Sequence, residues 1–281
     1  MTILEGIQLT TEYLEKKGID SARMNAELML AHILKCKRLD LYLQFDKPLK
    51  DEEVSLYREF LKRRSQFEPL QYILGTVEFY GLEFKVNRSV LIPRPETEIL
   101  IETILNNTSK EVSLTILDIG TGSGNIPISL ARNLPLAKIT SIDISGSAVE
   151  LANENAVLNG VNENITFVNA GIDEYAPDEK FDIIVSNPPY VSKDEYQNLQ
   201  PEILNYEPIE AVTDNNDGFY FYNLISEKAK SFLRRPGSLY FELGAELFPE
   251  VKNIMERKGF EKITFKKDYL NIERVIYGEL N

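Results

Sequence analysis

The sequence predicts an α/β protein whose mostly parallel sheet follows a small helical region. After about Ser113, apolar runs alternate with helical stretches, which is the pattern of βαβ units and a parallel sheet. Before about Gly75, short amphipathic helices with recognisable ends dominate instead. With 281 residues, 43% of them hydrophobic, the chain has ample material for one large core or two smaller ones.

The first 75 residues are expected to form a separate helical domain. Gly18 can end its first helix, and Asp51 can cap a segment that runs to Arg64. The stretch TVEFYGLEFKV then alternates around Gly81, which indicates a β-hairpin. We therefore expect a helical domain at residues 1–75, a hairpin linker at 76–87 and the sheet domain at 88–281.

Each expected strand of the sheet is a short apolar run. Five runs alternate with helical stretches: 114–119, 139–144, 165–168, 181–185 and 239–243. Two later runs, 262–265 and 273–277, lie close together. They are consistent with a final antiparallel pair, which gives seven strands in total.

Composition excludes several classes of site and partner. The chain has one cysteine and one histidine, which rules out disulfide frameworks, Cys/His zinc sites and His-dependent triads and fits a reducing cytoplasm. A net charge of −13 opposes nucleic-acid binding, and the basic runs at 62–64, 234–235 and 266–267 are interpreted as solvated helix ends. No apolar stretch is long enough to span a membrane. We expect a cytoplasmic protein without membrane or direct nucleic-acid contacts.

A glycine-rich turn follows the first strand of the expected sheet. It contains Asp118, Gly120, Thr121, Gly122, Ser123 and Gly124 and leads into a helical run. Glycines at this position let the backbone approach a ligand closely. Asp143 ends the next strand about twenty residues later, where a carboxylate can bind two ribose hydroxyls; as an alternative, it caps the following helix.

The pattern favours a nucleoside ligand without phosphates. The glycines are followed neither by Lys-Ser/Thr nor by an arginine clamp. S-adenosyl-methionine fits, with Asp118 facing its ammonium group and the glycine backbone bordering the methionine part. Ile172, after the third strand, is expected to offer an apolar face to the adenine.

The fourth strand ends at Asn187, Pro188, Pro189 and Tyr190. Prolines fix φ and donate no backbone hydrogen bond, so they make a rigid turn, which is the simplest interpretation of the tetrapeptide. At the ligand-binding edge of the sheet, the Asn187 side-chain oxygen and the Pro188 carbonyl can also accept both hydrogens of a planar amino group. The lone pair of the amino nitrogen then points at the methyl group of S-adenosyl-methionine, while the Tyr190 ring packs on the plane of the amino group.

These residues resemble class I methyltransferases that act on planar amino groups, and more narrowly the HemK family of release-factor glutamine methyltransferases. The resemblance covers nearly the whole chain. It includes PLQYILG at 69–75, LIPRPETE at 91–98, the glycine turn, Asp143, the Asn-Pro-Pro-Tyr tetrapeptide, YEP at 206–208 and DG at 217–218. Asn-Pro-Pro-Tyr alone also occurs in DNA adenine methyltransferases, whereas PRPETE makes the resemblance specific.

The resemblance implies a Rossmann-like class I fold and methylation of the glutamine amide nitrogen in the Gly-Gly-Gln motif of peptide chain release factors. S-adenosyl-L-homocysteine would be the product, and the helical domain would help recognise the release factor. The resemblance also implies that residues 120–124, Asp143, Ile172 and Asn187 bind the cofactor. It further implies that residues 187–190 bind the substrate amide. We expect a monomer.

The sequence departs from the family pattern at two places and leaves other substrates open. Gly171-Ile172 replaces an Asp-Trp-like pair, and AVTDNND at 211–217 lacks the usual Leu and Gly-Gly.

Three alternative functions remain open. They are those of a ribosomal-protein glutamine methyltransferase, an adenine N6 methyltransferase of DNA or RNA, and a non-catalytic adenosyl-ligand sensor. Arg94 and Glu96 either shape the entrance to the site or belong to a capped helix start.

Overall fold

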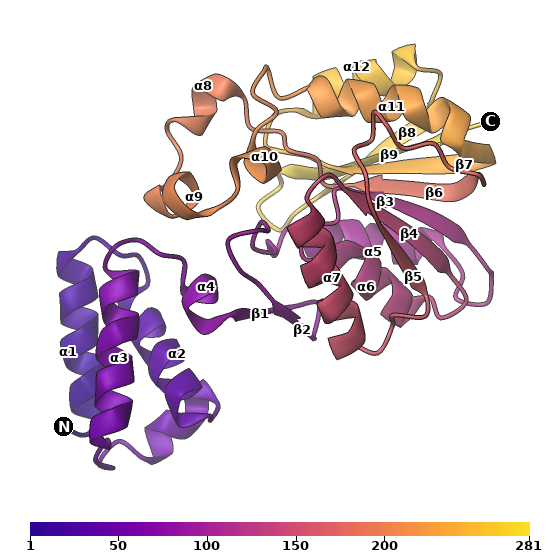
Figure 1. Ribbon diagram of the computed structural model, residues 1–281. Coiled ribbons are helices and arrows are strands. Elements are labelled where there is room, and N and C mark those ends of the chain that lie inside the picture. Colours follow the sequence, from indigo (N-terminus) through magenta and orange to yellow (C-terminus); the bar gives the residue numbers. More distant parts are fainter. The chain divides into compact units, whose positions relative to one another are not determined.

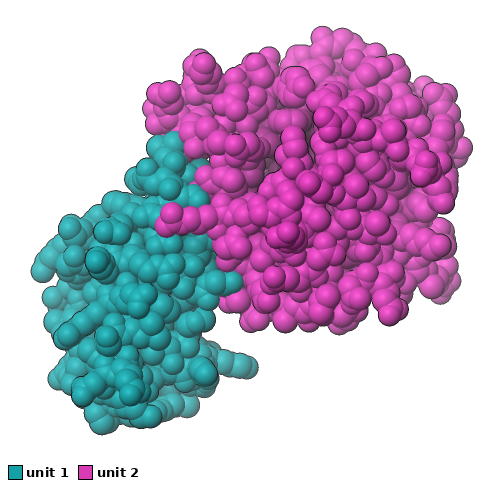
Figure 2. Space-filling view, viewed as in Figure 1, with its two compact units in different colours: residues 1–75, 200–206 teal, residues 76–199, 207–281 magenta.

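The computed structural model describes residues 1–281, which form two compact units (Figures 1 and 2). The helical unit contains residues 1–75 together with 200–206. The sheet unit contains residues 76–199 and 207–281. A short segment that is remote in sequence therefore belongs to the helical unit.

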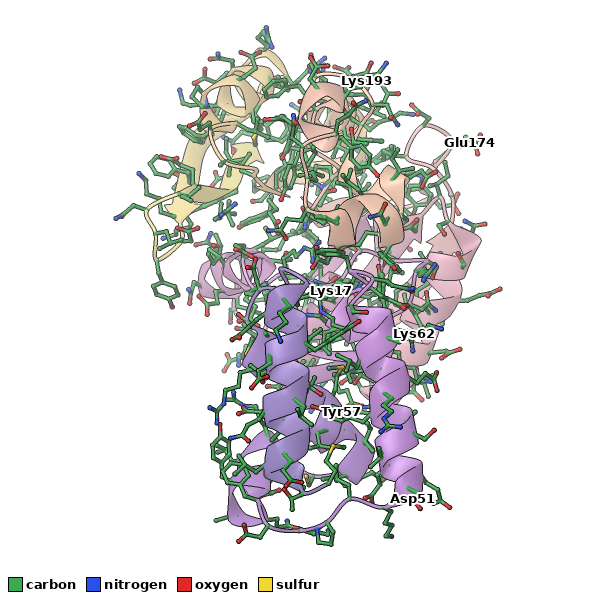
Figure 3. All side chains as sticks on the ribbon, turned by 90° about the vertical axis from the view of Figure 1, so that its left-hand side faces the viewer. Lys17, Asp51, Tyr57, Lys62, Glu174 and Lys193 are labelled. Atoms are coloured by element: carbon green, nitrogen blue, oxygen red, sulfur yellow. The ribbon has the colours of Figure 1, made fainter.

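The helical unit packs around one apolar core. Its helices are α1 (Ile3–Lys16), α2 (Ala22–Leu34), the 3₁₀ helix η1 (Arg38–Leu43), α3 (Asp51–Arg64), α4 (Leu70–Leu74) and α9 (Pro201–Tyr206). Lys17 and Lys62 lie at one end of α1 and α3 and Asp51 at the other, so the two helices run in the same direction (Figure 3). Tyr57 is buried, and its hydroxyl donates to the Ala26 carbonyl at 2.9 Å, which joins α3 to α2.

Polar contacts fasten α9 within the helical unit. The Arg64 guanidinium lies 3.0 Å from Glu202 Oε1, and the Tyr206 hydroxyl donates to the Gln66 carbonyl at 2.9 Å. Arg64 is only 6% exposed, so its expected role as part of a solvated helix end is wrong. Its guanidinium is a structural partner of Asn25 and Glu202 instead.

The sheet unit begins with the hairpin β1 (Thr76–Phe79) and β2 (Leu82–Lys85). Seven further strands make one sheet: β3 (Thr115–Ile119), β4 (Lys138–Asp143), β5 (Ile165–Asn169), β6 (Phe181–Ser186), β7 (Leu233–Glu242), β8 (Glu261–Lys267) and β9 (Glu273–Leu280). Their order is β5-β4-β3-β6-β7-β9-β8, parallel except for antiparallel β9. The predicted fold class is confirmed, including the final antiparallel pair.

Alternate residues of each strand supply two apolar layers. Ile116, Ile183 and Val185 face the layer that includes α5 (Thr97–Asn107), α6 (Asn125–Asn133) and α7 (Gly146–Leu158). Leu117 and Ile184 face the layer with α11 (Tyr220–Phe232) and α12 (Phe248–Arg257). Helices therefore cover both faces of the sheet (Figure 1), which is why consecutive residues of the central strands β3 and β6 are apolar and buried.

Two basic runs lie in strands rather than at helix ends. Arg234 and Arg235 belong to β7, and Lys266 and Lys267 end β8, so the expectation of helix ends there is wrong. Arg234 and Arg235 lie in an irregular part of β7, between the pairing of Leu233 with Phe181 and that of Ser238 with Ile183. Arg234 pairs with Asp182 at 3.0 Å.

Candidate active site

The carboxyl ends of β3, β4 and β6 meet at one edge of the sheet. Ile119 lies opposite Ile142 on one side and Ser186 on the other. The chain leaves β3 outward through β4 and β5, then returns to β6 on the opposite side of β3. This reversal is a topological switch point, where open α/β sheets bind ligands. Asp143 ends β4 here, and the glycine turn and Asn187 follow β3 and β6.

The glycine turn leaves open space beside its backbone. Gly120 and Gly122 have φ of +82° and +53°, a region that favours glycine. A side-chain carbon at Gly122 would meet no atom within 4 Å, and one at Gly120 would meet only the Asn187 carbonyl at 4.0 Å. The turn and the Asn-Pro-Pro-Tyr tetrapeptide therefore border the same space.

Asp118 is a fully buried carboxylate with one free oxygen. Its Oδ2 accepts from the Ser141 hydroxyl at 2.6 Å and from Thr121 Oγ1 at 3.1 Å. Oδ1 is buried without a hydrogen-bond partner. Burial raises the pKa of Asp118 to about 7, against the hydrogen bonds from Ser141 and Thr121. An unpaired buried acceptor suits a cationic ligand such as the ammonium group of S-adenosyl-methionine.

Asp143 joins the glycine turn to the loop that precedes α7. Its Oδ2 accepts from the Gly122 amide and its Oδ1 from the Ser145 amide, both at 2.9 Å. Ser145 itself caps α7 through the Ala148 amide. Burial raises the pKa of Asp143 in spite of these hydrogen bonds. The carboxylate thus has a structural task at the turn, and its other lone pairs are available to ribose hydroxyls.

Two apolar side chains, Ile144 after β4 and Ile172 after β5, differ in exposure. Ile172 is 6% exposed and packs in the core with Ile119 and Ile142. Ile144, directly after Asp143, is 76% exposed. Sequence reasoning did not single out Ile144, although an apolar residue after a strand-ending acid was visible. It offers an open apolar surface beside the expected nucleoside site.

The Asn-Pro-Pro-Tyr tetrapeptide is held from several sides. Asn187 Nδ2 donates to Thr97 Oγ1 at 3.4 Å, and Val191 forms a parallel bridge with Thr213. A side-chain carbon at Gly244 would lie 2.8 Å from Tyr190 Cδ2, so the ring packs directly on the glycine. Burial raises the pKa of the Tyr190 hydroxyl above its usual value.

Asp214 organises the loop in which the sequence departs from the family pattern. Its Oδ1 accepts from the amides of Asn216 and Gly218 at 2.8 and 3.1 Å, and its Oδ2 from the Tyr220 amide at 3.1 Å. A side-chain carbon at Gly218 would lie 2.5 Å from the Tyr190 carbonyl. The stretch AVTDNND thus forms a folded loop that packs on the tetrapeptide.

Arg94 pairs with a distant carboxylate. Its guanidinium lies 2.7 Å from each oxygen of Glu207, whose side chain is 1% exposed. The motifs PRPE and YEP are therefore joined across 113 residues. Burial raises the pKa of Glu207, and the Arg94 charge opposes that rise. No pattern along the chain indicates this pair.

Glu242, the last residue of β7, is another buried acid that sequence reasoning did not single out. It is 2% exposed, and its Oε2 has no hydrogen-bond partner. A carboxylate inside the apolar run LYFEL was the available signal. Burial raises the pKa of Glu242 to about 7, while hydrogen bonding from Thr97 and Asn187 lowers it.

The chain shows neither a metal cluster nor a membrane span. No group of three or more His, Cys, Asp or Glu side chains is arranged to hold a metal ion. None of the helices combines the length and apolar character needed to cross a bilayer.

Two family models match the chain. The model of the PrmC N-terminal domain matches residues 5–75, and the model of the methyltransferase small domain matches residues 95–207. The second match contains the glycine turn, Asp143 and the Asn-Pro-Pro-Tyr tetrapeptide.

Solved structures share the fold at low sequence identity. A methyltransferase from Pyrococcus furiosus matches 72% of this chain and 90% of its own, with a TM-score of 0.53 and 20% identity. The catalytic domain of hMettl16, in complex with a MAT2A 3′UTR hairpin, matches 82% of both chains with a TM-score of 0.57 and 18% identity.

Curated relatives match over almost the whole chain. Three are named release factor glutamine methyltransferase. That of Fusobacterium nucleatum is 42% identical over 96% of this chain and 77% of its own length. The relative from Geobacter sulfurreducens is 40% identical, and the match covers 99% of this chain and 97% of the relative. The relative from Chlorobaculum tepidum is 39% identical, and the match covers 97% of this chain and 95% of the relative. At this identity and coverage, the chain belongs to the family of release factor glutamine methyltransferases.

Proposed function

We propose that this protein transfers a methyl group from S-adenosyl-L-methionine to the side-chain amide nitrogen of the glutamine in the Gly-Gly-Gln motif of peptide chain release factors. The observation that carries the proposal is the shared space at the edge of the sheet. The Asn187 carbonyl is the one atom near the open side of Gly120. A methyl donor bound on the glycine turn would therefore adjoin the tetrapeptide that binds its acceptor.

The cofactor would lie along the ends of β3 and β4. The unpaired Asp118 Oδ1 would accept from its ammonium group, and Asp143 would bind its ribose hydroxyls. The backbone of residues 120–124 would border the methionine part. Ile144 and Ile172 are the apolar residues available to the adenine. Bound there, S-adenosyl-methionine would supply a methyl group already activated on a sulfonium.

The tetrapeptide would position the acceptor. An amide nitrogen is a poor nucleophile because its lone pair is delocalised into the carbonyl. Asn187 Oδ1 and the Pro188 carbonyl would accept its two hydrogens, with Pro189 keeping the turn rigid, so that the lone pair is directed at the methyl carbon. The Tyr190 ring, packed against Gly244, would lie on the amide plane. Transfer would form the nitrogen–carbon bond as the carbon–sulfur bond breaks, S-adenosyl-L-homocysteine would leave, and one proton of the amide nitrogen would pass to solvent.

The helical unit would supply recognition of the release factor beyond the glutamine. Residues 200–206 would link that recognition to the tetrapeptide, because they belong to the helical unit and lie between Tyr190 and Glu207 in the chain. We place the enzyme in the cytoplasm, where translation ends, and expect it to act as a monomer without binding nucleic acid.

Labelled S-adenosyl-methionine tests the proposal directly. The protein is incubated with a release factor, with the same factor carrying Gln→Ala in its Gly-Gly-Gln motif, with ribosomal proteins, or with duplex DNA. Label is expected only in the intact factor. Label in the Gln→Ala factor would contradict the assigned glutamine, and label in DNA or a ribosomal protein alone would favour those alternatives.

A further inference from the structure

Glu242 lies next to the tetrapeptide without a role in the chemistry described above. Ser186 is opposite Phe241 in the parallel pairing of β6 with β7, so Asn187 and Glu242 are the next residues of neighbouring strands. The Tyr222 hydroxyl donates to the Glu242 carbonyl at 2.8 Å, which fixes the backbone there. The carboxylate is thus held beside Asn187 in the core of the sheet unit.

Burying this carboxylate is unfavourable for stability. Oε2 has no hydrogen-bond partner, and an unpaired buried acceptor loses the hydration that it would have in the unfolded chain. A glutamine or leucine of similar size would avoid a buried charge at this position. Because the buried carboxylate lowers stability, we infer that it serves the function of the neighbouring tetrapeptide.

Asn187 needs to be oriented by its surroundings. An asparagine side chain presents an oxygen on one side and an NH₂ group on the other, and only the oxygen can accept from the substrate amide. Thr97 Oγ1 lies 3.4 Å from Nδ2 on the side of α5. A threonine hydroxyl alone accepts or donates with equal ease, so it does not fix the orientation of the amide. A neighbouring carboxylate, which only accepts when ionised, removes this ambiguity.

We propose that Glu242 is a positioning residue for methyl transfer: its ionised carboxylate, with the Thr97 hydroxyl, holds Asn187 Nδ2 and thereby turns Asn187 Oδ1 toward the glutamine amide. In this arrangement Thr97 Oγ1 accepts from Nδ2, a contact of 3.4 Å in the structure, and its single hydroxyl hydrogen would be donated to Glu242. This inference rests on the proposed function for its substrate. The arrangement of the three side chains belongs to the protein itself.

Protonation of Glu242 would release this orientation, because a carboxylic acid also donates. Burial raises the pKa of Glu242 to about 7. The groups around it are Glu96 before α5, Thr97 at the start of α5, Asn187 and Tyr190 after β6, Tyr222 on α11 and Arg274 on β9. Hydrogen bonds from Thr97 and Asn187 and the Arg274 charge favour the ionised form, and the Glu96 charge opposes it. Turnover should therefore fall as the pH drops through neutrality.

Glu242→Gln tests the role of the charge at nearly constant shape. Turnover is measured at saturating cofactor and release factor between about pH 5.5 and 8.5. The parent should lose turnover on the acidic side, whereas Glu242→Gln should be about ten- to hundredfold slower at high pH and lack that acidic limb. Exposed Glu246 is the matched control, and Glu246→Gln should keep the parent profile. A Glu242→Gln enzyme with the parent's turnover and acidic limb would overturn the inference.

A second pair of variants covers the case in which Glu242→Gln fails to fold. Thr97→Ser keeps the hydroxyl, and Thr97→Val removes it at nearly the same volume. Thr97→Ser should turn over at least about tenfold faster than Thr97→Val, with similar cofactor affinity in both. Equal turnover of the two variants would contradict the role of the hydroxyl.

The orientation of Asn187 can also be observed without any substrate. The NMR signal of its side-chain NH₂ group, assigned by its loss in Asn187→Ser, should titrate near neutral pH in the parent and not in Glu242→Gln. A parent signal that does not titrate would overturn the inference. This measurement separates the two proposals, because it gives a result even where the release factor is not methylated.

Discussion

Gly244→Ala should slow catalysis without touching the cofactor site. Gly244 lies beyond the end of β7, and the added carbon would lie 2.8 and 3.0 Å from Cδ2 and Cε2 of Tyr190 and 3.1 Å from Leu247 Cδ1. The first of these distances is at least about 0.6 Å shorter than ordinary van der Waals contact, which begins at 3.4 Å. Tyr190 would have to move, and its ring would no longer pack on the substrate amide as in the parent.

The size of the effect follows from this displacement. Misplacing a positioning group by about 1 Å can reduce the rate about a hundredfold, and overpacking costs about 1–3 kcal/mol. We expect kcat/KM for the release factor to fall about ten- to hundredfold, which corresponds to about 1.4–2.7 kcal/mol of transition-state stabilisation. Cofactor affinity should be unchanged, because Gly244 lies outside the glycine turn.

Steady-state methylation, calorimetry with the cofactor and denaturant unfolding together test this prediction. Gly146→Ala is the matched control: its added carbon would approach Asn169 Oδ1 only to 3.4 Å, an ordinary contact, so it should behave as the parent. A Gly244→Ala enzyme with the parent's kcat/KM, or one whose loss lies entirely in cofactor affinity, would refute the proposed role of Tyr190.

Four further predictions concern the cofactor and the acceptor. Asn187→Ala should lower kcat about a hundredfold, or roughly 3 kcal/mol, and affinity much less, because the lost acceptor acts mainly during transfer. Asn187→Asp should also be slow, since the added charge favours the bound sulfonium over the transition state; turnover at the parent rate would contradict this mechanism. Asp143→Ala should weaken cofactor binding by about 1–3 kcal/mol in calorimetry, and unchanged affinity would reject the ribose contact. Because the pKa of Asp118 is raised to about 7, cofactor affinity should fall as the pH drops below 7, and Asp118→Asn should remove that dependence; a parent affinity that is constant with pH would contradict the ammonium contact.

Local patterns in the sequence determined the type of fold and the main motifs. Short apolar runs predicted all seven strands of the sheet, and such runs arise because the central strands are covered by helices on both faces. The glycine turn and Asp143 were recognisable because parallel strands bring their carboxyl ends to one edge. Asn187-Pro-Pro-Tyr was recognisable because two prolines cannot continue a strand.

Only the tertiary structure decided which distant residues support these motifs. Arg94 pairs with Glu207 across 113 residues, and Arg64 with Glu202 across 138. The core position of Glu242 beside Asn187 depends on the pairing of β6 with β7. Partner choice between residues so far apart leaves no periodic pattern along the chain, because it is set by the packing of whole strands and helices. The role of the buried Glu242 carboxylate can therefore be inferred only from the side chains that surround it in the folded protein.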